Sequence, residues 1–326
     1  MTRPGSGHLI WLDGRLVDAA GPHLNVTDRG FQLGDGLFET ARARRGVVIE
    51  LDEHLERLRA GCLVLGLNLA ASDDQLADGI AALLAAEGLD GSGAKAGRAA
   101  EAGPTGGPGP IGDAALRITV SRGPLERRGL LPPGIEGLVA TVAIQCWPYV
   151  PTSPELLARG VRAVTSAIRR DPASPLAGVK TTSRADYVYA RLEADRAGAD
   201  DALFLTLDGR LSEATAANLF VIAGKTLATP PISAAILAGT TRTWLLAHAE
   251  QLGLVPTEID LQPADLLAAD EVVLSGSVAG IVPLVAFDGQ PVGGGRPGPR
   301  SRALRAARED WIDAMSMAAL LPEPAE

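Results

Sequence analysis

Apolar positions in the first half of the chain recur with two different periods. The segments Leu9–Leu12 and Arg15–Val17 flank the turn dipeptide Asp13-Gly14, which predicts two short strands joined by a hairpin. Further along, apolar residues at 51, 55, 58, 62 and 65 follow helical spacing, and a second stripe runs from 76 to 84. The first half is therefore predicted to combine strands with two amphipathic helices.

Strands and helices continue to alternate through the rest of the chain. The predicted strands are 116–120, 138–144, 161–166, 271–275 and 281–287, with a hairpin of 202–207 and 218–222 about Asp208-Gly209. The predicted helices are 181–197, 240–252 and about 298–317, the last preceded by a glycine-rich turn. Mixed elements in both halves predict an α/β (α+β) fold with two domains.

Composition suggests where the domains begin and end. Residues 87–113 are almost entirely Gly, Ala, Pro and Ser, so we expect a mobile surface insertion there. The segment Cys146–Pro154 holds three prolines, as in a stiff linker. We expect a smaller α/β domain at 1–147, a linker at 148–154 and a larger domain at 155–326.

Charge and composition exclude several classes of function. The net charge of −9, without any basic patch, argues against nucleic-acid binding. Cys62 and Cys146 lack metal-ligand spacing, so they are expected to be buried thiols and no metal site is predicted. No apolar signal core and no run of ~20 apolar residues is present. A cytoplasmic enzyme without a membrane partner is the expectation.

One lysine stands out as a candidate nucleophile. Lys180 follows the apolar stretch Leu176–Val179 at an expected loop-to-helix junction, where burial lowers an amine's pKa and frees it to attack a carbonyl. The alternative is an exposed lysine at the start of a helix. Lysine is scarce in this chain, and the others, Lys95 and Lys225, fall in the expected insertion and in a predicted turn.

Other segments supply what an aldehyde cofactor with a phosphate group, such as pyridoxal 5′-phosphate (PLP), requires. Glu213 can pair with a pyridine nitrogen, although it can equally be a turn carboxylate. Thr240 and Thr241 follow a glycine at a predicted helix N-terminus, which suits an anion, although plain N-capping is the alternative. A loop containing Gly276 and Ser277 can add N–H donors, and Arg57 can bind phosphate or remain a solvated helix arginine.

These ordered motifs resemble the class IV aminotransferases, the fold-type IV PLP enzymes. That family contains branched-chain aminotransferases, D-amino-acid aminotransferases and 4-amino-4-deoxychorismate lyase. The resemblance extends from about Ile10 to Glu309 and leaves out the expected insertion. Its markers are, in order, Asp28–Thr40, His54–Leu58, Leu176–Lys180, Ser212–Glu213, Asn218–Phe220, Gly239–Arg242 and Ser275–Ser277.

The resemblance implies a role for each matching residue. Lys180 is similar to the lysine that binds the cofactor aldehyde and moves the proton, and Glu213 to the carboxylate on the ring nitrogen. The implied phosphate-binding residues are Arg57, Thr240, Thr241, Gly276 and Ser277. The implied substrate-binding residues are Phe38, Thr40, Arg122, Arg128, Ser183 and Arg184. Members of the family are homodimers or larger assemblies, so a homodimer is expected.

Departures from the family pattern leave the reaction open. A typical branched-chain enzyme is disfavoured, because Ala217 replaces a glutamate and Tyr187 lies too far from Lys180 to match the tyrosine that holds the cofactor's 3′-oxygen. We expect a transaminase acting on D-amino acids or (R)-amines, with 2-oxoglutarate or pyruvate as acceptor. Arginines of the 122–128 loop can hold an acceptor carboxylate or be solvated.

Thr40 favours the alternative reaction, because a threonine at this place in the lyases is thought to help deliver a proton. The alternative is therefore 4-amino-4-deoxychorismate lyase, which releases pyruvate and leads to 4-aminobenzoate and folate. A branched-chain aminotransferase or a non-catalytic PLP-binding protein is less expected.

Overall fold

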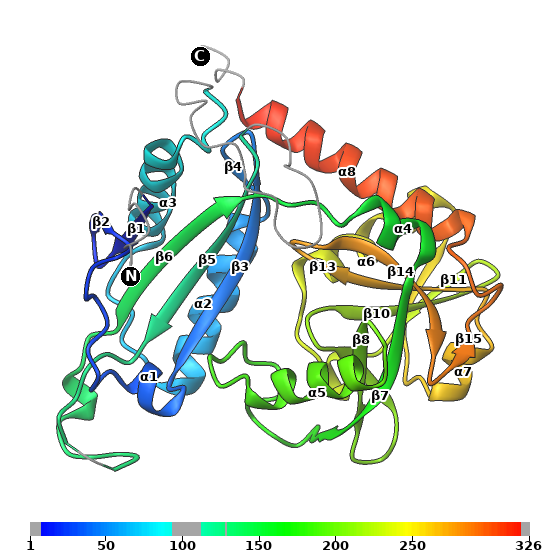
Figure 1. Cartoon of the computed structure of the whole chain (residues 1–326), viewed down its shortest axis with the longest axis horizontal. Coiled ribbons are helices and arrows are strands. Elements are labelled where there is room, and N and C mark those ends of the chain that lie inside the picture. The colour runs from blue at the N-terminus through cyan, green and yellow to red at the C-terminus, as the bar shows by residue number, and fades with distance from the viewer. Residues whose placement is uncertain (1–7, 93–111, 128, 321–326) are drawn as a thin grey trace. The chain divides into compact units, whose positions relative to one another are not determined.

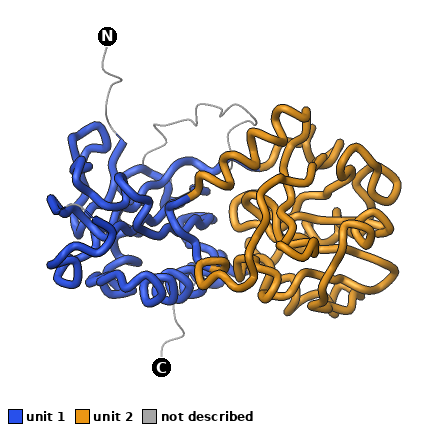
Figure 2. Tube along the Cα trace, turned by 90° about the horizontal axis from the view of Figure 1, so that it is seen from below, with its two compact units in different colours: residues 1–151, 179–183, 315–326 blue, residues 152–178, 184–314 orange. Residues whose placement is uncertain are grey.

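The structure is a computed structural model that describes residues 8–92, 112–127 and 129–320. It contains two β-sheets with helices, so the mixed α/β class predicted from the sequence is confirmed. The chain divides into two compact units, shown in blue and orange in Figure 2. Unit 1 comprises residues 1–151, 179–183 and 315–326, and unit 2 comprises residues 152–178 and 184–314. The expected boundary at 148–154 remains a prediction, and most of the expected insertion lies outside the described residues.

Unit 1 is built on a six-stranded antiparallel sheet with the strand order β2-β1-β6-β5-β3-β4. Helices α2 and α3 lie alongside this sheet in Figure 1, where α2 packs against β3 and α3 against β1 and β6. Its elements are β1 (Leu9–Leu12), β2 (Arg15–Asp18), α1 (Arg29–Leu33), β3 (Gly36–Arg44), β4 (Val47–Val48), α2 (Leu51–Leu65), α3 (Asp73–Glu87), β5 (Ala114–Ser121), a 3-10 turn (Ile135–Gly137) and β6 (Thr141–Pro148).

The pleat of the sheet in unit 1 separates an apolar face from a polar one. Alternate residues of β3, β5 and β6 join the buried core beneath the helices, among them Leu37, Leu116 and Ile144. Burying each such side chain contributes about 1.5–3 kcal/mol. Residues between them point to the opposite face, and the register places Phe38 opposite Thr119 and Thr40 opposite Arg117 there. This second face carries part of the candidate site.

Unit 2 is built on a nine-stranded mixed sheet with the order β12-β11-β10-β13-β14-β7-β8-β9, to which β15 adds beside β14. Its elements are α4 (Pro154–Arg159), β7 (Val161–Arg170), α5 (Ala185–Arg196), β8 (Asp201–Thr206), β9 (Leu211–Ala214), β10 (Asn218–Ala223), β11 (Thr226–Thr229), a 3-10 turn (Ile232–Ala234), α6 (Thr240–His248), a 3-10 turn (Glu250–Leu252), β12 (Val255–Glu258), α7 (Pro263–Leu267), β13 (Glu271–Gly276), β14 (Gly280–Phe287), β15 (Gln290–Pro291) and, up to residue 314, α8 (Pro299–Ala319).

Both faces of the central strands of this second sheet are buried. In β10, Leu219 and Val221 belong to one core cluster, whereas Phe220 and Ile222 belong to another. Helix α5 packs on β7 and β8, and α6 packs on β12 and β13. Covering both faces explains why these strands are continuous apolar runs instead of alternating ones.

The structure corrects two predictions of secondary structure in the second half of the chain. The helix predicted at 181–197 begins only at Ala185, because Thr181 forms a β-bridge to Leu37. The hairpin about Asp208-Gly209 is real, but its second strand is β9, whereas β10 pairs with β11 and β13. In both places the structure is determined by pairing with strands that are distant in the sequence, which the local pattern does not reveal.

Two further expectations concern single residues and membranes. Cys62 and Cys146 are free and buried, as predicted. Burial, together with the nearby carboxylate of Glu87, raises the pKa of Cys146 to about 12. Within residues 8–92, 112–127 and 129–320, no helix combines the length and the apolar character needed to cross a bilayer.

Candidate functional site

The backbone around Lys180 is fixed to the edge of β3 in unit 1. The N–H of Phe38 donates to the carbonyl of Lys180 at 3.0 Å, and the N–H of Thr182 donates to the carbonyl of Gly36 at 2.9 Å. The Thr182 hydroxyl also donates to the carbonyl of Gly34 at 2.9 Å. Lys180 therefore lies on a short strand-like segment that pairs with β3 through residues 180 and 182, and not at a helix start.

The Lys180 amine lies over an aromatic ring that it shares with an arginine. Its Nζ is 4.7 Å from the centroid of the Phe38 ring, and the Cζ of Arg117 is 3.8 Å from the same centroid. The Arg117 Nε donates to the Thr119 hydroxyl at 3.2 Å. An amine and a guanidinium close to one ring place two positive charges around it, which suits a carboxylate-bearing molecule.

Sequence reasoning missed Arg117, although a signal for it existed. The strand at 116–120 was predicted, and its alternation places Arg117 on the face opposite to Leu116 and Ile118. The same register places Thr40, a predicted substrate residue, directly opposite Arg117. An arginine in the middle of an apolar strand, on the face opposite to the core, is the sequence signal that indicates such a candidate site residue.

On the other face of β3, the predicted phosphate ligand Arg57 is held by a buried carboxylate. Its Nε and Nη2 donate to the two oxygens of Glu39 at 2.8 and 2.6 Å, and His54 Nδ1 lies 2.7 Å from Glu39 Oε2. The side chains of Glu39 and His54 are 1% exposed and that of Arg57 is 14% exposed. Arg57 is thus not a solvated surface arginine.

Electrostatics keep this buried carboxylate charged. Burial by itself would raise the pKa of Glu39, but hydrogen bonds and charge from Arg57 and His54 outweigh it and lower the pKa to about 2. Glu39 therefore remains an anion at neutral pH and orients the guanidinium of Arg57.

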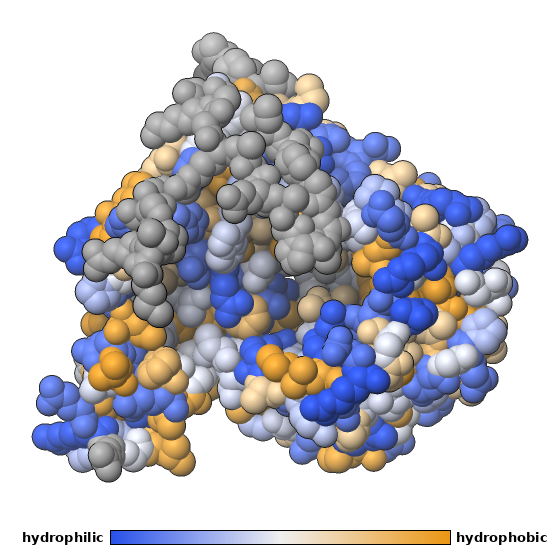
Figure 3. Space-filling view, viewed as in Figure 1, coloured by the Kyte–Doolittle hydropathy of each residue, from blue (hydrophilic) through white to orange (hydrophobic). Residues whose placement is uncertain are grey.

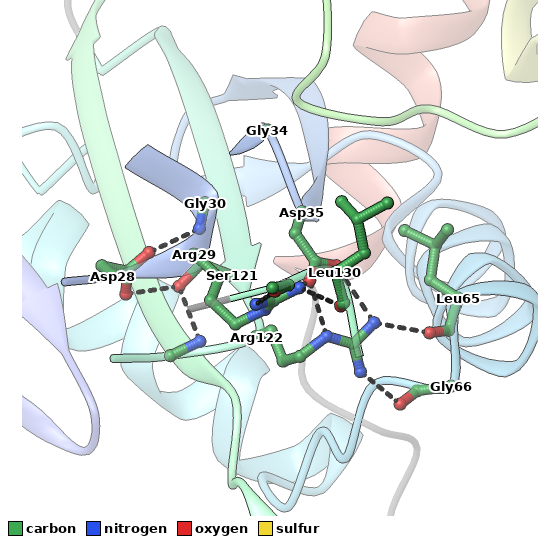
Figure 4. A network of polar contacts seen from close by, with 12 residues as sticks. Asp28, Arg29, Gly30, Gly34, Asp35, Leu65, Gly66, Ser121, Arg122 and Leu130 are labelled. Carbon is green, nitrogen blue, oxygen red and sulfur yellow. Dashed lines mark hydrogen bonds and ion pairs between the residues drawn. The ribbon is translucent and has the colours of Figure 1, made fainter. Parts of the chain in front are cut away.

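Arg122, a predicted substrate residue, belongs to the network of polar contacts in Figure 4. Its Nε and Nη2 donate to the two oxygens of Asp35 at 2.7 and 3.0 Å. Its Nη2 also donates to the Leu65 carbonyl at 2.7 Å, and its Nη1 donates to the Gly66 carbonyl at 2.8 Å. Arg29 donates to the same Asp35 at 2.9 Å. The loop that begins at Arg122 is thereby tied to the C-terminal end of α2.

The same network stabilises Asp28-Arg29-Gly30, the first three residues of the motif Asp28–Thr40. Asp28 caps α1 by accepting from the Gly30 N–H at 2.8 Å, and Ser121 donates to its second oxygen at 2.8 Å. Arg29 also donates to the carbonyls of residues 129 and 130 at 3.1 and 2.7 Å. Arg128, which the sequence also suggested for the substrate, lies outside the described residues.

Hydrogen bonds and charge outweigh burial at the centre of this network. Burial would raise the pKa of Asp35, but hydrogen bonds and charge from Arg122 and Arg29 lower it below the usual value. Asp35 is therefore a shared anion between two arginines, which favours an ordered loop.

In unit 2, Glu213 lies on β9 with both carboxylate oxygens held by donors. The Leu237 N–H donates to Oε2 at 2.8 Å, and the Tyr187 hydroxyl donates to Oε1 at 3.4 Å. Glu213 is 6% exposed, so it is not a solvated turn carboxylate. Burial, together with the nearby charge of Glu213, raises the pKa of Tyr187 to about 12, so this hydroxyl stays protonated and donates.

The two residues before α5 have different surroundings. The guanidinium carbon of Arg184 lies 3.0 Å from the centroid of the Tyr187 ring, and Nη2 donates to the Thr215 carbonyl at 3.4 Å. Ser183, in unit 1, lies against Gly34, where an added Cβ would meet Ser183 at 3.0 Å. Gly34 has a φ of 66°, which also favours glycine. Both residues were predicted to bind substrate, and that prediction stays open.

The N-terminus of α6 gathers the hydroxyls predicted to bind phosphate. The Thr240 hydroxyl is 3.2 Å from that of Ser277, and the cap residue is Gly239, which has no side chain to offer. The alternative of N-capping by Thr240 is therefore not what the structure shows. An added Cβ on Gly239 would meet Asn218 Oδ1 at 2.1 Å, so glycine is required there.

Two buried hydroxyls, one in the first turn of α6 and one near the end of β13, make no hydrogen bond. Within the part of the chain that the structure describes, neither Thr241 Oγ1 nor Ser275 Oγ has a partner. Both residues are 2% exposed. Buried hydroxyls without partners are costly, which suggests that a ligand supplies their acceptor. The four hydroxyls and the helix N-terminus together suit an anion such as phosphate.

Comparisons with known proteins agree with these features. A family model described as amino-transferase class IV matches residues 36–287. The chain is 30% identical to a putative branched-chain-amino-acid aminotransferase of Methanocaldococcus jannaschii over 92% of this chain and 95% of that protein. It is 27% identical to a D-alanine aminotransferase of Bacillus licheniformis (93% and 96%) and 28% identical to an aminodeoxychorismate lyase of Vibrio harveyi (80% and 86%).

Solved structures show the same fold. The branched-chain aminotransferase of Thermoproteus uzoniensis with norvaline has a TM-score of 0.79 and 27% identity, covering 94% of this chain and 95% of that one. Other structures of this fold contain pyridoxamine 5′-phosphate or a phosphopyridoxyl adduct. The chain therefore belongs to the class IV aminotransferases, the fold-type IV family whose cofactor is PLP.

Proposed function

We propose that this chain is a PLP-dependent transaminase that moves an amino group between an amino acid and a 2-oxo acid. The observation that carries the proposal lies in unit 1, where the amine of Lys180 and the guanidinium of Arg117 both lie over the ring of Phe38. A cation close to the Lys180 amine would hold the carboxylate of an amino-acid donor or a 2-oxo acid. Arg117 can serve as this cation because it is held on strand β5 close to the lysine.

The residues present fit the cofactor of the family. The unsatisfied hydroxyls of Thr241 on α6 and Ser275 on β13 suit the phosphate group, together with Thr240, Gly276 and Ser277. In unit 1, the orientation of Arg57 is fixed because its Nε–Nη2 edge is taken by Glu39, and the resemblance to the family implies a phosphate contact for this residue. Glu213, whose carboxylate accepts hydrogen bonds from Leu237 and Tyr187, suits a protonated ring nitrogen.

Each reacting group has a defined task in this proposal. When bound, PLP supplies an electron sink for the bond that breaks at the substrate carbon. Lys180 would hold the cofactor aldehyde through Nζ, and its amine would take the proton from the substrate Cα. Arg117 holds the substrate carboxylate, so that this Cα–H is presented to the lysine.

The donor class is the finer part of the proposal. We retain D-amino acids, with (R)-amines as a further class, and 2-oxoglutarate or pyruvate as acceptors. Branched-chain L-amino acids form a second donor set, because relatives named for them match almost the whole chain. Arg117 favours donors and acceptors that carry a carboxylate over simple amines.

A second candidate function is 4-amino-4-deoxychorismate lyase. Thr40 favours it, because its position opposite Arg117 places a hydroxyl on the same face as Phe38 and Lys180. The similarity to the Vibrio harveyi lyase also supports it. In that reaction the amino group stays on the product ring and pyruvate is released.

A half-reaction separates the two candidates. Holoprotein is mixed with D-alanine, D-glutamate, L-leucine or L-valine, and the visible absorbance of the bound cofactor is followed while the 2-oxo acid is quantified. A transaminase loses this absorbance and forms one equivalent of 2-oxo acid, and Lys180→Ala does neither. Failure with every donor, together with pyruvate release from aminodeoxychorismate, would overturn the transaminase proposal.

We also propose that the chain forms a homodimer and works in the cytoplasm. Unit 1 exposes large apolar side chains in two segments, Val26 and Phe31 around α1 and Leu130 and Leu131 in the β5–β6 loop. Arg29 holds these two segments together through the carbonyls of residues 129 and 130. Figure 3 shows apolar residues exposed beside polar ones on this loop. Such patches favour association, which light scattering on the purified protein tests.

A further inference from the structure

The side chain of Tyr187 connects the first turn of α5 to the acid on β9. Its ring is buried and meets Phe204 edge-on, with 5.1 Å between the ring centroids, and its hydroxyl reaches Glu213 Oε1 at 3.4 Å. Tyr189, two residues later on the same helix, is 46% exposed. Tyr187 therefore points into unit 2, whereas its neighbour points to solvent.

Two arginines restrict the ring of Tyr187. The Cζ of Arg184 lies 3.0 Å from the ring centroid, and the Cζ of Arg170 lies 5.0 Å from it. Arg170 is itself tied to the backbone, because Nη2 donates to the Ala177 carbonyl at 2.9 Å. Cations over a ring attract its face, so the phenol has little freedom to turn its hydroxyl away from Glu213.

We propose that Tyr187 is a positioning residue for Glu213. Its hydroxyl holds one carboxylate oxygen while the Leu237 N–H holds the other, so the acid stays both anionic and correctly oriented. This inference rests on the proposed role of Glu213 at the ring nitrogen of PLP. It differs from the role of the tyrosine in the resembling enzymes, which acts on the 3′-oxygen of the cofactor.

The expected effects follow from the charge on the acceptor. A hydrogen bond to a carboxylate stabilises its anionic form, so its removal raises the pKa of Glu213. Tyr187→Phe should therefore move the acidic limb of the kcat/KM profile to higher pH. A hydrogen bond to a charged group is worth about tenfold in an equilibrium constant. Apoprotein with Tyr187→Phe should accordingly bind PLP about tenfold more weakly.

The experiment uses apoprotein titrated with PLP, with binding followed by quenching of tryptophan fluorescence. The variants are Tyr187→Phe, Glu213→Gln and the double variant, with Tyr189→Phe as the matched control. We expect Tyr189→Phe to bind like the wild type. We expect Tyr187→Phe to lose about twofold or less in the Glu213→Gln background, because the anion on which it acts is gone.

Three outcomes would overturn the inference. They are an unchanged dissociation constant in Tyr187→Phe, an unchanged acidic limb, or an equal loss in both backgrounds, which would mean that Tyr187 acts elsewhere. Failure of the wild type to bind PLP would instead overturn the proposed function.

Urea unfolding of the apoprotein shows whether Tyr187→Phe is folded. If it is not folded, a second variant tests the inference. Arg184→Gln leaves the hydroxyl in place and releases the ring. We expect it to weaken PLP binding two- to threefold, and an unchanged dissociation constant would also overturn the inference.

Discussion

Replacing Glu39 by glutamine should destabilise unit 1 strongly although it removes only a charge. The carboxylate accepts two bonds from Arg57 and one from His54, and all three side chains are buried or nearly so. Glutamine keeps the shape of glutamate but can no longer accept on both sides of the fork. The guanidinium of Arg57 then remains in a largely buried place without its counter-charge.

The magnitude follows from the pKa of Glu39. A fall from the ordinary value of 4.5 to about 2 means that the folded protein favours the anion. That preference corresponds to about 3 kcal/mol of stability at neutral pH. Breaking one side of a buried ion pair typically costs about 3–5 kcal/mol, which agrees with this value. We expect Glu39→Gln to lose about 3 kcal/mol at pH 7.

The sign of the pH dependence is also determined. Because the pKa of Glu39 is lowered on folding, its contribution is complete above about pH 4.5 and disappears as the pH falls towards 2. Glutamine does not titrate. The difference in unfolding free energy between wild type and Glu39→Gln should therefore shrink to less than half at about pH 3.

Urea unfolding of the apoproteins, followed by circular dichroism at several pH values, measures this difference. Glu56→Gln is the matched control, since Glu56 is an exposed residue on the same helix as Arg57. The control should differ from wild type by less than about 0.5 kcal/mol. Equal losses for the two variants at pH 7, or a loss that is the same at pH 7 and pH 3, would refute the reasoning.

Three further predictions concern other parts of the site. Asp35→Asn should cost about 1–3 kcal/mol in urea unfolding and make the loop after Arg122 more sensitive to protease, because Arg29 and Arg122 lose their shared anion; wild-type stability with an equally resistant loop would contradict this. Thr241→Val should stabilise the apoprotein by about 1 kcal/mol, since it removes a buried hydroxyl without a partner, and weaken PLP binding; the opposite sign in either measurement would disprove it. Arg117→Met should raise the KM for 2-oxoglutarate about tenfold while PLP affinity is unchanged; an unaltered KM would remove Arg117 from the substrate site.

Local patterns in the sequence were sufficient to predict most strands and helices that have a single apolar face. The hairpin of β1 and β2 and the helix α2 were predicted because a turn dipeptide or a helical stripe is visible without any partner. Strand β3 escaped prediction because its pattern is interrupted by Glu39, Arg42 and Arg44, which are all buried. Arg42 and Arg44 are compensated by Asp113, which lies far away in the sequence.

The candidate site shows the same division between local and long-range information. The chain's motifs identified Lys180 and the hydroxyls of Thr240 and Thr241 at the start of α6, since small and polar residues cluster there along the sequence. The partners of those residues were not visible. Glu39 under Arg57 and Tyr187 beside Glu213 meet only after strands and helices have packed, so spacing along the chain carried no signal for either contact.

The segment that carries Lys180 has a consequence for dissecting the protein. Residues 179–183 belong to unit 1 although the chain reaches them only after the first 27 residues of unit 2, 152–178. A fragment that stops at residue 151 would lack both the amine and the backbone that covers Gly36 and Phe38, leaving a bare strand edge prone to self-association. In two halves separated at residue 151, residues 179–183 of the second half would therefore have to pair with that edge again, and the Lys180 amine would reach Phe38 only if they did so.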